Sequence, residues 1–526
     1  MSGTAIRLGR AGAMPFTRRN VWELGNDWAD PILWYARGVG AMKARALADP
    51  TSWRFYGAIH GLDTQLWQQL GYLGPSDPMP SDAAVQRFWL QCQHGSWYFL
   101  PWHRGYLLAF EANIRDAVSK LGGPADWALP YWNYFKPDEF KLPAAFASPD
   151  WPDGQGNNPL FVPQRYGPNS DGNVYVPVDM INLDAMNDPD FTGVASGGGP
   201  GFGGVDTGFE HGGQVHGGIE TQPHDWVHGL VGGGDPQNPQ LPGLMSDPDT
   251  AGLDPIFWLH HANIDRLWEV WRQNPATHVN PSDPNWTKGP GNIGERAFSM
   301  PMPGGNPWDY TPGDMVDLAP LNYTYDDLTP AVAAVPPSAR LMLLGASAGA
   351  AQAMEGAVAV PGTKKVELIG ANRDALRVAG GDIRTSVQLD GGMRRKVAAS
   401  LEAVAATPAA VPDRVFLNLE NVRGLVDSTA FKVYVGLPAG ANPADHPENL
   451  AGSIALFGVR KASRADGEHA GKGLTFVLEI TNLVDRLHLN NALDVDALDV
   501  RIVPVKPVPE DAQVTIGRVS IFRQGR

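Results

Sequence analysis

Two segments of this chain bring histidine into strongly aromatic and apolar surroundings. Residues 92–104 read Cys-Gln-His-Gly-Ser-Trp-Tyr-Phe-Leu-Pro-Trp-His-Arg, and residues 254–266 read Asp-Pro-Ile-Phe-Trp-Leu-His-His-Ala-Asn-Ile-Asp-Arg. Neutral imidazole is a ligand that suits copper, zinc or iron, and an apolar shell keeps bulk water away from a reactive metal. These segments predict a protein organised around a bound metal pair.

The first segment supplies two histidines that one helix could position. Pro101 suits the first turn of a helix, where its missing N–H costs nothing, and the apolar pattern continues for several turns. His103 would then project from the first turn, and His94 would lie before it. His60 ends another aromatic stretch and is a further candidate ligand.

His224 and His228 stand at i and i+4, so a helix would place both on one face, where they could bind one ion together. This spacing also occurs in zinc peptidases, but those enzymes need glutamate directly after the first histidine. Asp225 stands there, which disfavours a peptidase.

The second segment opens a predicted helix over residues 257–273 with two adjacent histidines, His260 and His261. Adjacent residues point about 100° apart on a helix, so only one of the two can face the ion of His224 and His228.

Six histidines thus divide into two groups of three. Three imidazoles per ion, with open positions left over, describe a catalytic site, and no carboxylate lies at ligand spacing within either group. An all-imidazole shell favours copper over magnesium, calcium or manganese. Two such ions roughly 3.5–4 Å apart could hold a diatomic oxidant between them. The expected ligands are His60, His94 and His103 for one ion, and His224, His228 and His261 for the other.

A glycine-rich stretch, residues 193–218, contains His211 and His216. A flexible glycine loop cannot hold tight metal geometry, so we expect both histidines to be solvated and neither to bind metal.

The composition is that of a soluble globular protein: 526 residues, 43% hydrophobic and 18% charged, which favours two or three domains. The formal charge of −15 argues against nucleic acid or an anionic membrane as the main partner. A single cysteine, Cys92, excludes a disulfide within the chain. Residues 1–20 lack the apolar core of a secretory signal, so we expect a cytoplasmic protein, with export on a partner protein left open.

The sequence predicts three parts: a mainly helical catalytic domain with long loops over residues 1–328, an Ala/Pro-rich linker over 329–365, and a β-rich domain over 366–526. Strand-like runs near residues 431–435, 474–480, 500–505 and 514–521, separated by turn residues, suggest a β-sandwich.

Residues 19–327 resemble the tyrosinase family, the type 3 copper proteins that include polyphenol oxidases, catechol oxidases and haemocyanins. Asp254-Pro255-x-Phe257-Trp258-x-x-His261-x-x-x-Asp265 is similar to the family's second-copper signature, and His94 with Phe-Leu-Pro-Trp-His103-Arg to the first. The resemblance implies a central four-helix bundle, two copper ions with dioxygen as co-substrate, ortho-hydroxylation of monophenols, and oxidation of o-diphenols to o-quinones.

The resemblance also assigns individual residues. It selects His261 as the ligand and makes His260 a neighbour that supports it. It implies a thioether between Cys92 and the ring of His94. Glu220 matches an acidic residue that orients a water near the second copper and helps take the proton of the phenol.

Three further positions concern substrates and access. Asp225 stands where members active on monophenols often have asparagine, so it could hold the same water or itself accept a proton. Gly229, together with Asp225, bears on whether the enzyme is a tyrosinase, a diphenol-only oxidase or an o-aminophenol oxidase. Pro248 falls where the family has a gate residue over the second copper, and a compact proline there suggests an open entrance.

The Tyr323-x-Tyr325 pair resembles the motif that ends the family's catalytic domain, and residues 431–522 are similar to the C-terminal sandwich of plant-type polyphenol oxidases. That domain covers the copper entrance and keeps those enzymes latent. The sequence therefore predicts a tyrosinase or polyphenol oxidase acting on small phenols. A diphenol-only catechol oxidase and an o-aminophenol oxidase are alternatives, and a haemocyanin-like oxygen carrier is a remote one. A homo-oligomer and a copper-delivery partner are left open.

Overall fold

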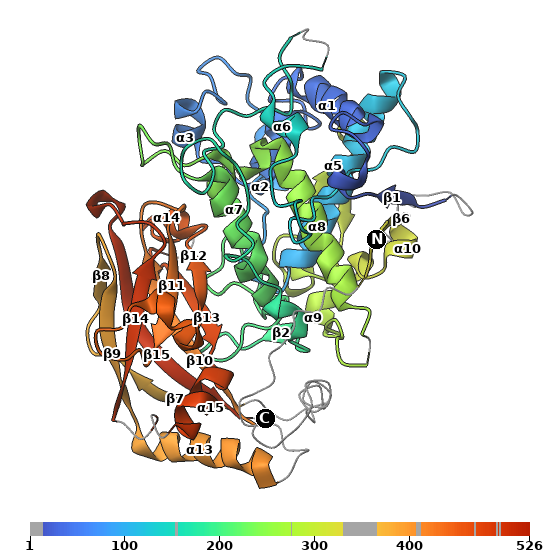
Figure 1. Cartoon of the computed structure of the whole chain (residues 1–526). Helices are drawn as coiled ribbons and strands as arrows, with labels where there is room; N and C mark the ends of the chain where they lie inside the picture. Colours follow the sequence, from blue (N-terminus) through green and yellow to red (C-terminus); the bar gives the residue numbers. More distant parts are fainter. Residues whose placement is uncertain are drawn as a thin grey trace.

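The fold is that of a computed structural model, which describes residues 14–152, 156–274, 276–329, 365–406, 412–467, 470–490, 493 and 496–525. A mainly helical region, blue to yellow in Figure 1, lies beside a β-rich region in orange and red. This confirms the predicted fold class. The predicted linker, residues 329–365, lies almost entirely outside the described residues.

The helical region contains short strands and long connecting loops. Its α-helices are α1 (Asp30–Lys43), α2 (Trp53–His60), α3 (Thr64–Gln69), α4 (Asp82–Phe88), α5 (Phe99–Lys120), α6 (Ala144–Ala147), α7 (Asp225–Gly232), α8 (Pro255–Trp271), α9 (Pro284–Thr287) and α10 (Leu318–Leu321). Its strands are β1 (Phe16–Arg18), β2 (Thr192–Gly193), β3 (Gly204–Val205), β4 (Phe298–Pro301), β5 (Pro307–Tyr310) and β6 (Tyr323–Tyr325). No helix within the described ranges is long and apolar enough to cross a membrane.

Local sequence determines where the histidine-bearing helices begin. The hydroxyl of Ser52 accepts the Phe55 amide at the start of α2, and the carboxylate of Asp254 accepts the Ile256 amide at the start of α8, where Pro255 needs no partner. Arg165 holds this cap through donors 2.6–3.0 Å from both carboxylate oxygens of Asp254. Residues far apart in sequence therefore fix the first turn of α8.

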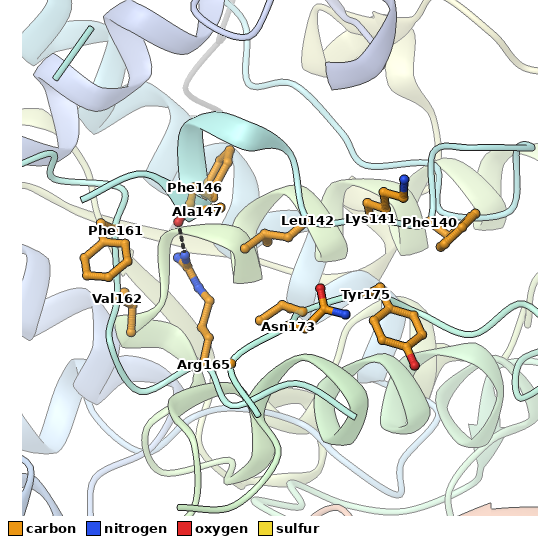
Figure 2. Close-up of a pocket in the computed structure, with 12 residues that line it drawn as sticks. Phe140, Lys141, Leu142, Phe146, Ala147, Phe161, Val162, Arg165, Asn173 and Tyr175 are labelled. Atoms are coloured by element: carbon orange, nitrogen blue, oxygen red, sulfur yellow. Dashed lines mark hydrogen bonds between the residues drawn. The ribbon is translucent and has the colours of Figure 1, made fainter. Parts of the chain in front are cut away.

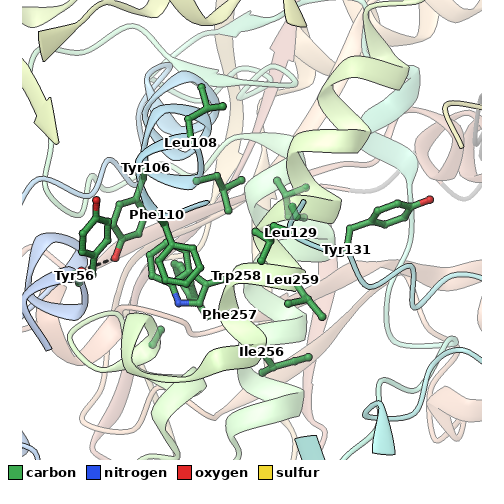
Figure 3. Packing of buried hydrophobic residues seen from close by; sticks show 14 of the residues in the cluster. Tyr56, Tyr106, Leu108, Phe110, Leu129, Tyr131, Ile256, Phe257, Trp258 and Leu259 are labelled. Atoms are coloured by element: carbon green, nitrogen blue, oxygen red, sulfur yellow. Dashed lines mark hydrogen bonds between the residues drawn. The ribbon is translucent and has the colours of Figure 1, made fainter. Parts of the chain in front are cut away.

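An aromatic core holds α2, α5 and α8 together (Figure 3). The rings of Phe110 and Trp258 stack at a centroid distance of 3.5 Å, and Tyr56 and Tyr106 stack at 6.0 Å. The Tyr106 hydroxyl donates to the backbone carbonyl of Tyr56 at 2.6 Å. Large rigid rings bury much apolar area at low entropic cost, so this core fixes the three helices relative to one another.

A buried ionic network ties α5 and α8 to the end of the helical region. Asp265 of α8 accepts hydrogen bonds from Arg104 and Arg18 and from the hydroxyl groups of Tyr323 and Tyr325. Strand β6, which carries both tyrosines, pairs in parallel with β1, which carries Arg18. The aspartate of the second-copper signature and the tyrosine motif are thus parts of one structural unit.

The β-rich region forms one nine-stranded sheet. Its strands are β7 (Val366–Ala371), β8 (Leu376–Val378), β9 (Ile383–Leu389), β10 (Arg414–Arg423), β11 (Ala430–Val435), β12 (Leu450–Ala455), β13 (Leu474–Glu479), β14 (Ala497–Pro504) and β15 (Val514–Gln524), with α13 (Gly391–Ala406), α14 (Val459–Ala462) and α15 (Thr481–Leu489). The order is β12-β11-β14-β9-β7-β15-β10-β13, and β8 pairs with β15. The two end strands, β12 and β13, lie side by side, so the sheet curls back on itself. This single curled sheet encloses the apolar core of the β-rich region.

Candidate metal centre

The helices bring the predicted ligands into two adjacent clusters. His60 ends α2, His103 lies in the first turn of α5, and His228 lies on α7. His94 lies before α5, and His224 directly precedes α7. Within each cluster the candidate ligand atoms lie within 4.8 Å of one another. The first cluster is His60, Cys92, His94 and His103, and the second is His224, His228, His260 and His261.

The histidines of the first cluster are oriented through their Nδ1 atoms. His60 and His103 donate to backbone carbonyl groups at 2.8 Å, and His94 donates to the carboxylate of Glu220 at 2.7 Å. A neutral imidazole that donates through Nδ1 keeps a lone pair on Nε2. All three rings therefore offer Nε2 to a common ion.

The second cluster has the spacing of ligands that share an ion. His224 donates through Nδ1 to Asp225 at 2.9 Å, and His228 donates to the Met245 carbonyl at 2.7 Å. The Nε2 atoms of His228 and His261 are 3.3 Å apart. Two imidazole nitrogens bound at 2.0–2.1 Å to a tetrahedral ion lie about 3.3 Å apart, so this pair needs little movement to bind metal.

The adjacent histidines of α8 both reach the second cluster. The ring of His261 stacks on that of His103 at a centroid distance of 4.4 Å and so lies between the clusters. His260 stacks on His224 at 5.4 Å, and its Nδ1 lies 3.2 Å from the Tyr134 hydroxyl. The choice of His261 as the ligand stays a prediction.

Burial keeps these imidazoles neutral, which is the form that binds metal. It lowers the pKa of His60 to about 4 and the pKa values of His94, His103 and His261 well below their ordinary value. The Nε2 atoms of His60, His94 and His224 have no hydrogen-bond partner within the described part of the chain. Buried unpaired acceptors are costly, and a shared cation would satisfy them. The donor set therefore fits two copper ions.

Cys92 lies inside the first cluster. Its sulfur is 3.4 Å from Nε2 of His103 and within 4.8 Å of a ring nitrogen of His94. Burial raises the pKa of this thiol well above its ordinary value. The thioether to His94 stays a prediction.

Glu220 and Asp225 both lie fully buried against candidate ligand histidines. Glu220 also accepts the Gly95 amide, at 3.0 and 3.1 Å from its two oxygens. Burial raises the pKa of both carboxyl groups, and His216 opposes this rise. Each carboxylate accepts a hydrogen bond that orients a candidate ligand histidine. This role is separate from any contact with water.

The prediction that His211 and His216 are solvated is wrong, because both are buried. His211 lies between the Cys92 carbonyl, 3.0 Å from its Nδ1, and Lys461, whose amino group is 2.6 Å from its Nε2. His216 donates to Asp225 at 2.8 Å. The glycines of this loop allow close packing: a Cβ on Gly213 would lie 2.4 Å from the Gly95 carbonyl oxygen.

The two predicted access residues lie in different surroundings. The carbonyl of Pro248 accepts the hydrogen bond of His60, so its backbone lies beside the first cluster, and its role as a gate over the second stays a prediction. It is buried, and Gly458 of the β-rich region lies near its ring. A Cβ on Gly229 would meet no atom within 4 Å, so the space next to His228 is open.

Sequence reasoning missed Phe457, a residue of the β-rich region that enters the metal centre. Its ring stacks on His228 at a centroid distance of 4.3 Å and lies 5.6 Å from both His94 and His224. It thus contacts ligands of both clusters and is 1% exposed. The sequence around Phe457 is an ordinary apolar turn. Only its place after β12 and before Gly458 could have marked this residue as unusual.

A surface cavity of about 420 Å³ lies apart from the histidines (Figure 2). Phe140, Phe146 and Tyr175 line it, and Arg165 donates to the Phe146 carbonyl at its edge. The donors of Arg165 are already used for Asp254 and for backbone carbonyls, which leaves Lys141 as the other charged side chain among the described lining residues.

Comparison with known proteins identifies both regions. The family described as the common central domain of tyrosinase matches residues 50–176 and 179–274, and a domain of unknown function (DUF7868) matches residues 365–524. Tyrosinase HcTyr1 of Hahella sp. (strain CCB-MM4) is 34% identical over 97% of this chain and 99% of its own. A chloroplastic polyphenol oxidase of Malus domestica is 28% identical over 48% of this chain and 40% of its own.

Two solved structures share the fold over nearly the whole chain. Latent apple tyrosinase superposes with a TM-score of 0.58 at 22% identity, covering 98% of both chains. Recombinant latent aurone synthase, a polyphenol oxidase, superposes with a TM-score of 0.57 at 19% identity, covering 97% of this chain and 90% of its own. Both structures therefore combine a helical region and a C-terminal domain in the same arrangement.

Proposed function

The chain belongs to the tyrosinase family of copper-dependent phenol oxidases, and from this we propose that its two histidine clusters hold a dicopper centre that oxidises o-diphenols to o-quinones and hydroxylates monophenols. The proposed ligands are His60, His94 and His103 for one ion, and His224, His228 and His261 for the other. A bound copper pair supplies the activation of dioxygen and the acceptance of two electrons from the phenol.

The protein's own residues orient the ligands and exclude water. Backbone carbonyls fix His60, His103 and His228, whereas carboxylates fix His94 and His224. Hydrogen bonds of this kind set the tautomer and make the imidazole a better donor. Phe99 and Phe257 pack on the rings and keep the centre dry.

The spacing of the His228 and His261 Nε2 atoms is the observation that carries this proposal, because 3.3 Å is the separation of two imidazole nitrogens that share a tetrahedral ion. The Nε2 atoms of His60, His94 and His224, unpaired among the described residues, support it. Copper analysis of the loaded protein tests it. We expect two copper ions per chain in the wild type and one in His261→Ala, while His260→Ala should retain two. Two ions in His261→Ala would contradict the ligand assignment.

Asp225 and Gly229 both bear on the choice between monophenols and diphenols. Its two oxygens accept hydrogen bonds from His224 and His216, so it resembles an occupied acceptor more than a free base. Both oxygens of Glu220 also accept hydrogen bonds, from His94 and Gly95, so both carboxylates stay candidates to help take a phenol proton. Oxygen uptake with L-tyrosine and with L-DOPA distinguishes the cases, and uptake with L-DOPA alone would favour the catechol oxidase alternative. An o-aminophenol as third substrate tests the other alternative.

We also propose that the β-rich region is a lid that keeps the enzyme latent, with Phe457 in the place of substrate. Its ring packs on His228 and lies near His94 and His224. A phenol ring needs the same apolar space in front of both clusters. The entrance that Pro248 suggested is accordingly covered.

Phe457→Ala tests the lid. We expect a clear rise in the rate of L-DOPA oxidation without any activation step, because truncation frees the space of one ring. Leu450→Ala, at an exposed position of β12, is the matched control and should leave the rate unchanged. An unchanged rate in Phe457→Ala would contradict the assignment of this residue as the plug.

A further inference from the structure

The loop before α7 places a histidine against both carboxylates of the metal centre. Nδ1 of His216 lies 2.8 Å from Oδ2 of Asp225 and 3.8 Å from Oε1 of Glu220. Since a carboxylate oxygen accepts, His216 donates to Asp225. All three side chains are buried, so the contact is shielded from solvent.

Asp225 connects His216 to a proposed copper ligand. Its Oδ1 atom accepts the Nδ1–H of His224 at 2.9 Å, while Oδ2 accepts His216. Both oxygens are thereby engaged, and the carboxylate plane is fixed. His216 consequently stands one residue away from the second cluster without belonging to it.

The backbone of this loop is held on two sides, so His216 has a defined place. Gly213 donates its amide to the His94 carbonyl, and the Gln214 carbonyl accepts the Thr475 amide of β13 at 2.8 Å. Val215 forms an isolated parallel bridge with Thr475. Residues of the helical region and of the lid therefore fix the position of the imidazole.

We propose that His216 is a positioning residue for the dicopper centre: it holds the Asp225 carboxylate so that this group orients His224 and does not itself turn toward the second copper. The inference rests on the proposed function. Without the donor, Oδ2 of Asp225 is a buried, unpaired carboxylate oxygen, which is costly. The nearest compensation is rotation of the carboxylate, which loses the hydrogen bond to His224.

Two substitutions distinguish the effect of losing the hydrogen-bond donor from the effect of changing the size of the side chain. His216→Asn keeps an N–H close to the place of Nδ1, whereas His216→Leu has similar size and no donor. We expect His216→Leu to bind the copper of the second cluster roughly 10–100-fold more weakly, as measured by equilibrium competition with a chelator, because rotation of Asp225 removes the partner of His224, a loss that costs this much. His216→Asn should stay within about threefold of the wild type, following the same reasoning.

A matched control and a double variant make the test specific. His278→Leu changes a histidine that packs on Trp271 away from the clusters and should leave copper affinity unchanged. In an Asp225→Ala background, His216→Leu should cause no further loss, because its effect passes through Asp225. Thermal unfolding of each metal-free variant establishes that the fold is intact.

Wild-type copper affinity in His216→Leu, an equal loss in His216→Asn, or an additive loss in the Asp225→Ala background would each overturn the proposal. A wild-type protein that binds two copper ions and oxidises no phenol would instead overturn the proposed function, and the affinity comparison would still decide the role of His216.

Discussion

At the scale of single residues, five of the six candidate ligands donate a hydrogen bond from Nδ1, and these five differ in the group that accepts it. His94 and His224 donate to the carboxylates of Glu220 and Asp225, while three other ligands donate to carbonyl groups. A carboxylate partner makes an imidazole more basic than a carbonyl partner does. Each cluster thus contains one ligand that is stronger than its neighbours.

Replacing Glu220 by Gln tests the first of these carboxylates. The amide cannot accept on both sides as the carboxylate does for His94 and Gly95. We expect roughly 10–100-fold weaker copper binding at the first cluster, measured by chelator competition. Glu210→Gln, at a nearby carboxylate outside the clusters, is the control. Unchanged affinity in Glu220→Gln would show that His94 needs no charged partner.

Cys92 is the subject of a second prediction at this scale. A bond between its sulfur and the ring of His94 removes two hydrogens, so the intact mass of copper-matured protein should be lower by about 2 Da, and the unfolded protein should not react with a thiol reagent. A full mass together with one reactive thiol would refute the bridge.

The residues also show what a sequence can predict. The clustering of the six predicted histidines could be expected from residue type and spacing, because each lies on or near a helix with an apolar pattern. The burial of His216 could not be predicted in this way, since it results from contacts of a glycine loop with Gly95 and Thr475, residues remote in sequence. Glycine indicates flexibility in isolation and allows close packing in the fold.

At the scale of secondary-structure elements, the position of α8 relative to α5 determines whether the clusters meet. His261 of α8 stacks on His103 of α5, and Asp265, one turn later, bonds Arg104 of α5. The helix boundaries were predicted to within a few residues, because Pro255 and the apolar periodicity define them. The partner of Asp265 in β1, Arg18, had no signal in the local sequence.

Asp265→Asn tests this unit. Removing the charge breaks the buried pair of Arg104 with Asp265, which typically costs about 3–5 kcal/mol of unfolding free energy, whereas Arg18 keeps Glu111. Denaturant unfolding of the metal-free protein measures it. The control is Asp309→Asn, which breaks an exposed pair with Arg87 and should cost less than about 1 kcal/mol. Equal effects of the two substitutions would contradict a structural role of the network.

At the scale of the whole molecule, α14 fastens the lid to the helical region, next to α7 (Figure 1). Arg460 pairs with Asp247 and Asp63, and Lys461 pairs with Asp249 at 2.8 Å. Phe457 stands two residues before this helix. The sequence predicted the lid and could not identify the plug, because contacts between domains leave no periodic pattern in either one.

The ion pair of Lys461 with Asp249 predicts how acid affects the docking of the lid. Burial alone would raise the pKa of Asp249, but Lys461 lowers it to about 2. A depressed pKa stabilises the docked lid above the ordinary carboxyl value of about 4, and this contribution is lost as the pH falls toward 2. We expect activation by brief acid exposure to begin below about pH 4. The measurement is the rate of L-DOPA oxidation after return to neutral pH. Lys461→Met should have a higher rate than the wild type before acid exposure, and acid exposure should raise its rate less. Equal acid profiles of the two proteins would contradict this role.

The central claim is that the two histidine clusters form a dicopper centre for phenol oxidation behind a lid. Oxygen uptake by the copper-loaded protein with L-tyrosine and with L-DOPA, before and after brief acid exposure, tests it most directly. We predict two copper ions per chain, slow uptake before exposure, and faster uptake with L-DOPA, and with L-tyrosine, afterwards. A protein that holds two copper ions and consumes no oxygen with either phenol in either state would contradict the account.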